Sequence, residues 1–241
     1  MTTMASAAGM VEPPPASALP FLAPRPQGEA PSPAAVYRRL TGCDPATALV
    51  GDDITFDRHV LAAILAVAAA DGGSVAERAG LSAEDLAALL HRHFPAAGDM
   101  GPRWRTRPGA EDDEVVMVRD LLLARRSEAG EVGRWLAGML ARRALEPNHL
   151  WEDLGLRQRT ELSRLMARHF APLAERNINN MRWKRFFYRM LCEDDGFVMC
   201  STPVCTQCAD FALCFGDESG ESRMADRRRA LALAGQPVTP S

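Results

Sequence analysis

The sequence VLAAILAVAAA, from Val60 to Ala70, is the longest uncharged apolar stretch of this 241-residue chain. It has about half of the roughly 20 residues that a helix needs to cross a bilayer. Its length and lack of charge therefore predict a helix that is buried in a protein core.

Helical patterns extend on both sides of this stretch, from Ala34 to about Leu145. Ser82, followed by Glu84 and Asp85, is typical of a helix start, because a serine side chain can accept a hydrogen bond from the first turn. The carboxylates from Glu111 to Glu114 would lie at the positive end of the next helix.

Loops that connect helices are predicted at Asp71-Gly-Gly and between Pro95 and Pro108, where glycine and proline interrupt the helical pattern. No run of alternating β-branched residues is present. The sequence therefore predicts an all-α fold, in which a helical domain carries an irregular C-terminal cysteine-rich metal-binding loop and follows a disordered N-terminal leader.

Two amphipathic helices are predicted in the C-terminal half. Between Gln158 and Phe170, one helical face collects Leu162, Leu165, Met166, His169 and Phe170, and Pro172 then breaks the pattern. Between Asn180 and Leu191, apolar residues on one side (Trp183, Phe187, Met190 and Leu191) oppose arginines on another (Arg182, Arg185 and Arg189). We call these three arginines the arginine stripe.

The chain divides into three parts by composition. Residues 1–33 are rich in proline, alanine and serine and predict a disordered leader. Residues 34–216 form the helical domain, which includes a cysteine-rich loop at 192–216. Residues 217–241 form a polar tail with a short helix predicted from Met224 to Leu233.

The composition of the chain limits which partners and which cellular compartment we expect. The chain is 47% hydrophobic, enough for a sizeable core, and its formal charge of −3 gives no overall attraction to nucleic acid or to an anionic membrane. No basic segment precedes an apolar run at the start of the chain, so no secretory signal is predicted. We therefore expect a cytoplasmic protein, in which thiols stay reduced and clustered cysteines indicate metal or redox chemistry.

The main chemical motif is CSTPVCTQCADFALC, which places Cys200, Cys205, Cys208 and Cys214 within fifteen residues. Such close cysteines can converge only in an irregular loop. Thiolate sulfur favours zinc, copper(I) and iron–sulfur centres over hard cations. The motif therefore predicts that all four cysteines bind a soft metal or a metal cluster.

The spacing favours iron–sulfur over zinc without excluding zinc. Zinc sites of four cysteines usually have two short knuckles separated by a longer insertion, whereas these four ligands form one group with a single C-x2-C. The C-x4-C-x2-C opening is the spacing of ferredoxins, although in plant-type ferredoxins the fourth cysteine lies much further along the chain.

Two further residues are candidate auxiliary ligands, Cys192 and His149. Cys192, eight residues before the motif, is either an auxiliary ligand or a buried structural cysteine. His149 is a weaker ligand candidate, and His169 is expected to be a hydrogen-bonded core histidine. The arginine stripe suits an oxyanion or an acidic partner surface, although a solvated helix face is the ordinary alternative.

Three segments together resemble the NifQ family of nitrogen-fixation proteins: HLWEDLGL at 149–156, RTELSRLMARHFAPLAERN at 159–177 and MRWKRFFYRMLCEDDGFVMCSTPVCTQCADFALCFG at 181–216. The resemblance implies a bacterial carrier that is not an enzyme and that supplies molybdenum for synthesis of the nitrogenase iron–molybdenum cofactor. It implies a molybdenum-containing iron–sulfur cluster on the four motif cysteines, with molybdate as the metal source. The implied partners are the cofactor scaffold complex and the nitrogenase iron protein.

Alternative functions remain open on the residues alone. The chain has no phosphate-binding glycine loop, no G-x-S-x-G and no HExxH, so catalysis has little support. An electron-transfer protein would use the same cysteines for a permanent iron–sulfur cluster. A zinc module that binds nucleic acid or protein would use them with the basic helix, but the acidic overall charge weakens the nucleic-acid form. We expect neither nucleic acid nor membrane as a partner.

Overall fold

The computed structural model describes residues 31–194 and Cys214, and all regular secondary structure in these residues is helical. This confirms the predicted all-α fold. The helices are α1 (Pro33–Thr41), α2 (Asp53–Ala70), α3 (Val75–Ala79), α4 (Ala83–His93), α5 (Asp113–Ala124), α6 (Glu131–Ala144), α7 (Leu150–Asp153), α8 (Arg159–His169), α9 (Ala171–Ala174) and α10 (Trp183–Asp194), with short 3-10 turns η1 (Pro45–Thr47), η2 (Pro95–Ala97) and η3 (Pro102–Trp104).

Three regions named by the sequence lie outside the described residues: most of the leader, the cysteine-rich residues 195–213, and the tail from 215 onward. The described chain begins just before α1. Ser32 caps this helix by accepting a hydrogen bond from the Ala35 N–H, and Pro33 occupies its first turn. The helix therefore starts one residue earlier than composition indicated.

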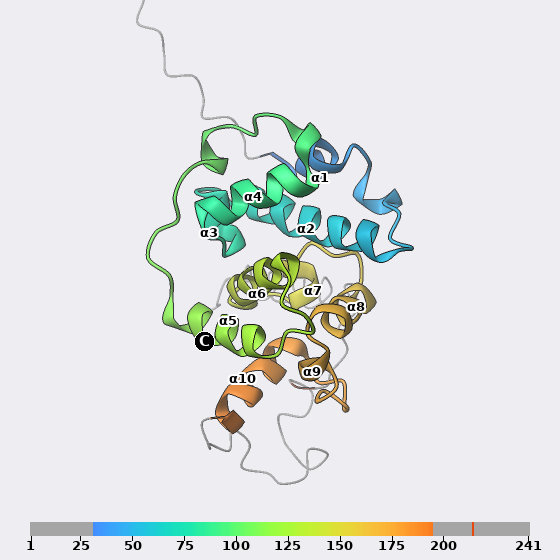
Figure 1. Cartoon of the computed structure of the whole chain (residues 1–241), viewed down its shortest axis with the longest axis vertical. Helices are drawn as coiled ribbons and strands as arrows, with labels where there is room; N and C mark the ends of the chain where they lie inside the picture. The colour runs from blue at the N-terminus through green and yellow to red at the C-terminus, as the bar shows by residue number, and fades with distance from the viewer. Residues whose placement is uncertain (1–30, 195–213, 215–241) are drawn as a thin grey trace, which may run out of the picture.

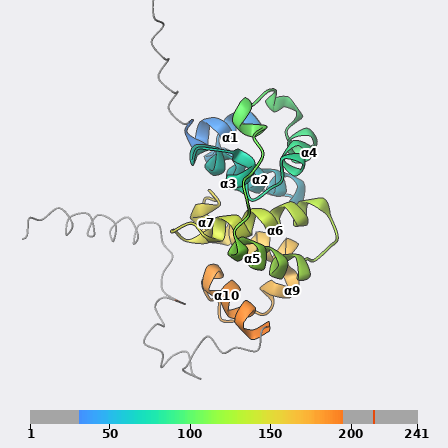
Figure 2. The ribbon, with the colours of Figure 1, turned by 90° about the vertical axis from the view of Figure 1, so that its left-hand side faces the viewer.

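Helix α2 contains the predicted buried stretch and is the centre of the N-terminal group of helices. From Val60 to Ala66 every side chain is buried, because neighbouring helices cover α2 on several sides. Figures 1 and 2 show α1 to α4 together at one end of the molecule and α10 at the other, with α6 between them. The apolar stretch is thus a core helix, as predicted.

Helix starts follow the sequence signals. The Ser82 hydroxyl accepts a hydrogen bond from the Asp85 N–H at 2.9 Å and caps α4. Asp112 caps α5 in the same way, with Asp113 and Glu114 in the first turn next to the positive end of the helix. The predicted starts of these two helices are confirmed.

The N-terminal group joins the middle of the molecule at a contact between two glycines. Gly80, which ends α3 with a φ of +68°, faces Gly138 of α6 so closely that a Cβ atom on either residue would collide with the carbonyl oxygen of the other. Only glycine lets the two backbones approach in this way. This contact fixes how closely α3 packs on α6.

A buried polar network ties α1 and α8 to α2. The Tyr37 hydroxyl lies 2.7 Å from His59 Nδ1, and His59 Nε2 lies 3.4 Å from Glu161 Oε2. Glu161 also accepts hydrogen bonds from the backbone and side-chain N–H groups of Arg157. Because all three ring and carboxyl groups are buried, their mutual hydrogen bonds offset the loss of contact with water.

None of the helices in residues 31–194 combines the length and the apolar character that a membrane span requires.

Candidate metal centre

Helix α10 precedes the cysteine motif and is held in the core by one aromatic face. Trp183, Phe186, Phe187 and Met190 are buried, and their spacing of three and four residues places them on one side of the helix. The ring of Trp183 packs edge-on against Phe186, with centroids 5.8 Å apart. This face anchors α10 against α5 and the rest of the core.

The segments 149–156 and 181–216 meet where α7 contacts α10. Lys184, the only lysine of the chain, reaches α7, where its Nζ lies 2.6 Å from Asp153 Oδ2, and it also donates to the carbonyl of Glu146. Arg143 Nε donates to the Asp153 carbonyl at 2.7 Å. Burial lowers the pKa of Lys184, and the Asp153 carboxylate opposes that effect. No pattern in the sequence indicates this ion pair, which fixes α10 to α7.

Polar contacts order the turn that leads into α10. The Asn177 side chain brackets Met181, since it accepts from the Met181 N–H at 2.8 Å and donates to the Met181 carbonyl at 2.9 Å. Asn180 adopts a φ of +53°, in the left-handed region that asparagine tolerates better than most residues. Arg159 of α8 donates to the Asn180 carbonyl at 3.2 Å.

Cys214, the last cysteine of the motif, lies at the start of α10. The backbone N–H of Arg182 donates to the Cys214 carbonyl at 2.8 Å. The Cys214 side chain is half-buried and packs against the hydrophobic core. One end of the motif is therefore placed by the fold, next to the first residue of the helix. Cys200, Cys205 and Cys208 lie outside the described residues, and the role of all four cysteines as ligands stays a prediction.

Cys192 lies near the opposite end of α10. It is nine residues after Trp183, which corresponds to about 14 Å along an α-helix. Its side chain is half-buried and forms no disulfide with any described residue. The structure thus separates Cys192 from Cys214 by most of the length of the helix.

The two histidine candidates have different surroundings. His149 is half-buried at the N-cap of α7, where its backbone N–H donates to Glu152 Oε2 at 3.2 Å. Its use as a metal ligand stays a prediction. His169 Nε2 lies 2.8 Å from Asp57 Oδ1, so the expected hydrogen-bonded core histidine is confirmed. Within residues 31–194 and Cys214, no three His, Cys, Asp or Glu side chains form a metal-binding group.

The arginine stripe is only partly engaged in ion pairs. Arg189 Nε lies 2.7 Å from Glu193 Oε1, and Arg176 reaches the other oxygen of this carboxylate at 3.1 Å. The Arg185 guanidinium makes no hydrogen bond or ion pair with any residue that the structure describes. A pocket of about 310 Å³ lies beside this part of α10, lined by Phe186, Arg189, Met190 and Glu193 together with residues 176–179 and Met181.

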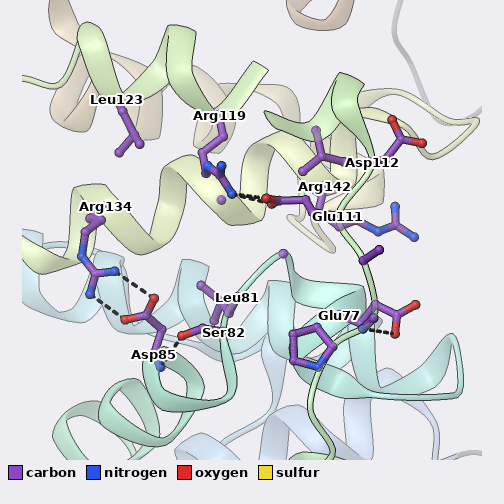
Figure 3. Close-up of a pocket in the computed structure, with 16 residues that line it drawn as sticks. Glu77, Leu81, Ser82, Asp85, Glu111, Asp112, Arg119, Leu123, Arg134 and Arg142 are labelled. Atoms are coloured by element: carbon purple, nitrogen blue, oxygen red, sulfur yellow. Dashed lines mark hydrogen bonds and ion pairs between the residues drawn. The ribbon is translucent and has the colours of Figure 1, made fainter. Parts of the chain in front are cut away.

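A larger cavity of about 470 Å³ lies between the N-terminal helices and α5 and α6 (Figure 3). Arg134 forms a two-pronged ion pair with Asp85 at its edge, with one N–O distance of 2.6 Å, and Arg119 pairs with Glu111. Its walls are mainly apolar, and none of Cys192, Cys214 and His149 lines it. Of the other charged residues in its lining, Arg142 pairs with Glu146, and Glu77 and Asp112 accept hydrogen bonds from backbone N–H groups. Each charged side chain of the lining therefore already has a partner.

Comparison with known proteins identifies the family. The NifQ family model matches residues 60–216. A NifQ homolog of Sinorhizobium fredii is 42% identical over 175 residues, which cover 70% of this chain and 76% of that protein. NifQ of Rhodobacter capsulatus is 44% identical over 160 residues, covering 66% of this chain and 87% of that protein, and NifQ of Azotobacter vinelandii is 40% identical over 154 residues, covering 58% and 77%.

No solved structure matches this chain. The family model, in contrast, extends over well more than half of the sequence, from within α2 to the residues just after the cysteine motif. The chain therefore belongs to the NifQ family of nitrogen-fixation proteins.

Proposed function

We propose that this protein is a carrier that supplies molybdenum, within an iron–sulfur cluster, for synthesis of the nitrogenase iron–molybdenum cofactor. The observation that carries the proposal is the position of Cys214. In a chain of the NifQ family, the last cysteine of a four-thiolate motif is fixed by its backbone to the start of a buried, arginine-bearing helix.

The chemistry of the motif suits this cargo. Thiolates of Cys200, Cys205, Cys208 and Cys214 would bind iron, since soft sulfur ligands hold iron–sulfur centres. Three of these cysteines would hold iron, and the fourth, or a group outside the motif, would serve the molybdenum. A molybdenum atom with exchangeable ligands can be loaded and later released. The role of the protein is thus transfer of a metal and not catalysis of a reaction.

Arg185 is the best candidate for attracting molybdate to the site. Its guanidinium is not paired with any described carboxylate, whereas Arg189 is held by Glu193. Guanidinium groups bind tetrahedral oxyanions through two parallel hydrogen bonds. The stripe residue without such a pairing would therefore contribute most to oxyanion capture.

Metal analysis of anaerobically purified protein tests the proposal. We expect iron, acid-labile sulfide and molybdenum together. Stoichiometric zinc without sulfide would refute the proposal and favour a zinc-binding module. Iron and sulfide that never acquire molybdenum, even with molybdate in the medium, would favour electron transfer.

Transfer is tested separately in a purified cofactor-synthesis system that contains the scaffold complex and the nitrogenase iron protein but no molybdate. Loaded protein should support cofactor synthesis there, and the matched variant R185Q should load less molybdenum while retaining its iron. If loaded wild-type protein fails to support synthesis, the donor role is wrong and only metal storage remains.

A further inference from the structure

The cavity that α3 and α4 form with α5 and α6 has the size of a small-molecule site. Its volume of about 470 Å³ lies within the range of about 300–1,000 Å³ that is typical of ligand pockets. All of the residues that line it belong to the described part of the chain. Figure 3 shows Leu81 and Leu123 on opposite sides of this space.

Apolar surface makes up most of the cavity walls. Val115 and Leu123 of α5 contribute to one wall, and Leu81, which lies between α3 and α4, contributes to another. A space of this volume admits on the order of ten water molecules, for which apolar walls offer few hydrogen-bond partners. Their replacement by an apolar molecule is favourable, because it removes apolar surface from water.

The charged groups at the cavity disfavour an anion. Its three arginines are each paired with a carboxylate, so none of them is available to a ligand. Glu77 and Asp112, in contrast, accept hydrogen bonds from the backbone N–H groups of Gly109 and Glu114, at 3.3 and 2.8 Å, and neither forms an ion pair with a described residue. The lining therefore carries an excess of negative charge at these two carboxylates.

One wall of the cavity is a segment with few hydrogen bonds of its own. Pro108, Gly109 and Ala110 belong to the connection between η3 and α5, and all three line the cavity. Among the described residues, their only hydrogen bond is the one from the Gly109 N–H to Glu77. This wall can therefore move to admit a ligand at the cost of one long hydrogen bond.

We infer that this cavity binds one small molecule that is neutral and mainly apolar, of the class of compact ring compounds. The volume limits the size of the ligand, the walls select apolar surface, and the carboxylates without cationic partners disfavour negative charge. Neither Cys192 nor Cys214 lines the cavity, so the inference does not depend on the proposed function.

The test uses two fluorescent probes that differ by one charged group. N-phenyl-1-naphthylamine is neutral, and 1-anilino-8-naphthalenesulfonate has the same rings with an added sulfonate. Both are titrated into the full-length protein and into two variants. Leu123→Trp fills the cavity, and Met117→Trp is the matched control, because Met117 also lies on α5 and is half-exposed but does not line the cavity.

We expect wild type and Met117→Trp to bind one equivalent of the neutral probe with affinities that agree within about twofold. Leu123→Trp should bind it at least about tenfold more weakly, because its indole occupies the same space. Wild type should bind the sulfonate at least about tenfold more weakly than the neutral probe. If Leu123→Trp does not fold, Ala110→Trp fills the cavity from an exposed segment and should give the same loss.

Three results would overturn the inference. Equal affinity of the folded cavity variant and Met117→Trp for the neutral probe would show that the probe binds elsewhere on the protein. Equal affinity of wild type for the two probes would contradict the selection against anions. The lack of any saturable binding to wild type would show that the cavity is not a ligand site.

Discussion

Lys184 on α10 and Asp153 on α7 form an ion pair of 2.6 Å that joins segments 31 residues apart in the chain. The Asp153 side chain is only 2% exposed. Removal of Lys184 leaves the buried Asp153 carboxylate without its cation, with only the Asn148 side-chain amide as a donor at 2.8 Å. Loss of one partner of a buried ion pair typically costs about 3–5 kcal/mol. Lys184→Met should therefore lower the free energy of unfolding by about 3 kcal/mol, as measured by urea denaturation followed by circular dichroism.

The neighbouring substitution Arg185→Met is the control for this prediction. Arg185 makes no hydrogen bond or ion pair with a described residue, so its loss should change stability by less than about 1 kcal/mol. Because methionine keeps most of the alkyl chain of lysine, equal effects of the two substitutions would show that the charge of Lys184 does not contribute to stability.

The contact between Gly80 and Gly138 predicts a second pair of matched variants. Gly138→Ala would place a methyl group against the Gly80 carbonyl oxygen, and this overpacking should cost about 1–3 kcal/mol. Gly133 lies in the same helix, but a Cβ there would meet the Arg126 side chain at an ordinary 3.6 Å. Gly133→Ala should therefore be neutral or stabilise by up to about 1 kcal/mol, since alanine favours helix.

Thermal unfolding of both glycine variants distinguishes the two effects. If Gly138→Ala unfolds at the same temperature as wild type, α3 can move away from α6 without cost, and the close approach does not determine how these helices pack.

Glu161 should make stability depend on pH in the acid range. Burial raises its pKa, but the hydrogen bonds from His59 and Arg157 outweigh this and lower the pKa to about 2, compared with an ordinary value of about 4.3. A carboxylate with a lowered pKa stabilises the folded state above its unfolded pKa, and this contribution is lost as pH falls towards the folded pKa. Wild type should therefore lose on the order of 3 kcal/mol between about pH 5 and pH 2 through this group.

The variant Glu161→Gln isolates the contribution of this carboxylate. Its free energy of unfolding should be lower at pH 7 and should fall less steeply between pH 5 and pH 2. Parallel curves for the two proteins in urea denaturation across this range would assign the acid sensitivity to other carboxylates.

The separation of Cys192 from Cys214 predicts different effects on metal content. Under the proposed function, Cys214→Ala should lower the iron bound per protein after reconstitution, because it removes a motif ligand. Cys192→Ala should leave the iron content unchanged, since Cys192 lies about 14 Å along α10 from the residue beside Cys214. Iron loss in Cys192→Ala with an unchanged helical spectrum would restore it as an auxiliary ligand.

The sequence was sufficient to predict the helices because their signals are local. The uninterrupted apolar residues of α2 and the serine cap of α4 act within a few residues, and both predictions are confirmed. The ion pair of Lys184 could not be predicted in this way, because the charge of one residue does not indicate which distant carboxylate it will contact. The pairing of α7 with α10 and the contact of two glycines depend on the folded chain, and no periodicity reports them.

At the candidate metal site, too, the sequence predicted the local motif but not its three-dimensional surroundings. The cysteine spacing predicted a soft-metal centre, but it gave no reason for the Trp183 indole to be buried without an acceptor among the residues that the structure describes. That observation required coordinates, since an aromatic residue on an apolar face is ordinarily explained by packing alone.

The bond between Arg182 and Cys214 has a consequence for metal affinity. Asp194 ends α10 and Cys214 is tied to its start, so these two described residues lie at opposite ends of a helix about 18 Å long. The entropy lost when two chain ends are brought together is thus already accounted for by folding of the helical domain. Under the proposed function, metal binding would therefore not have to bring these two positions together, and the fourth thiolate would already be placed at the start of α10.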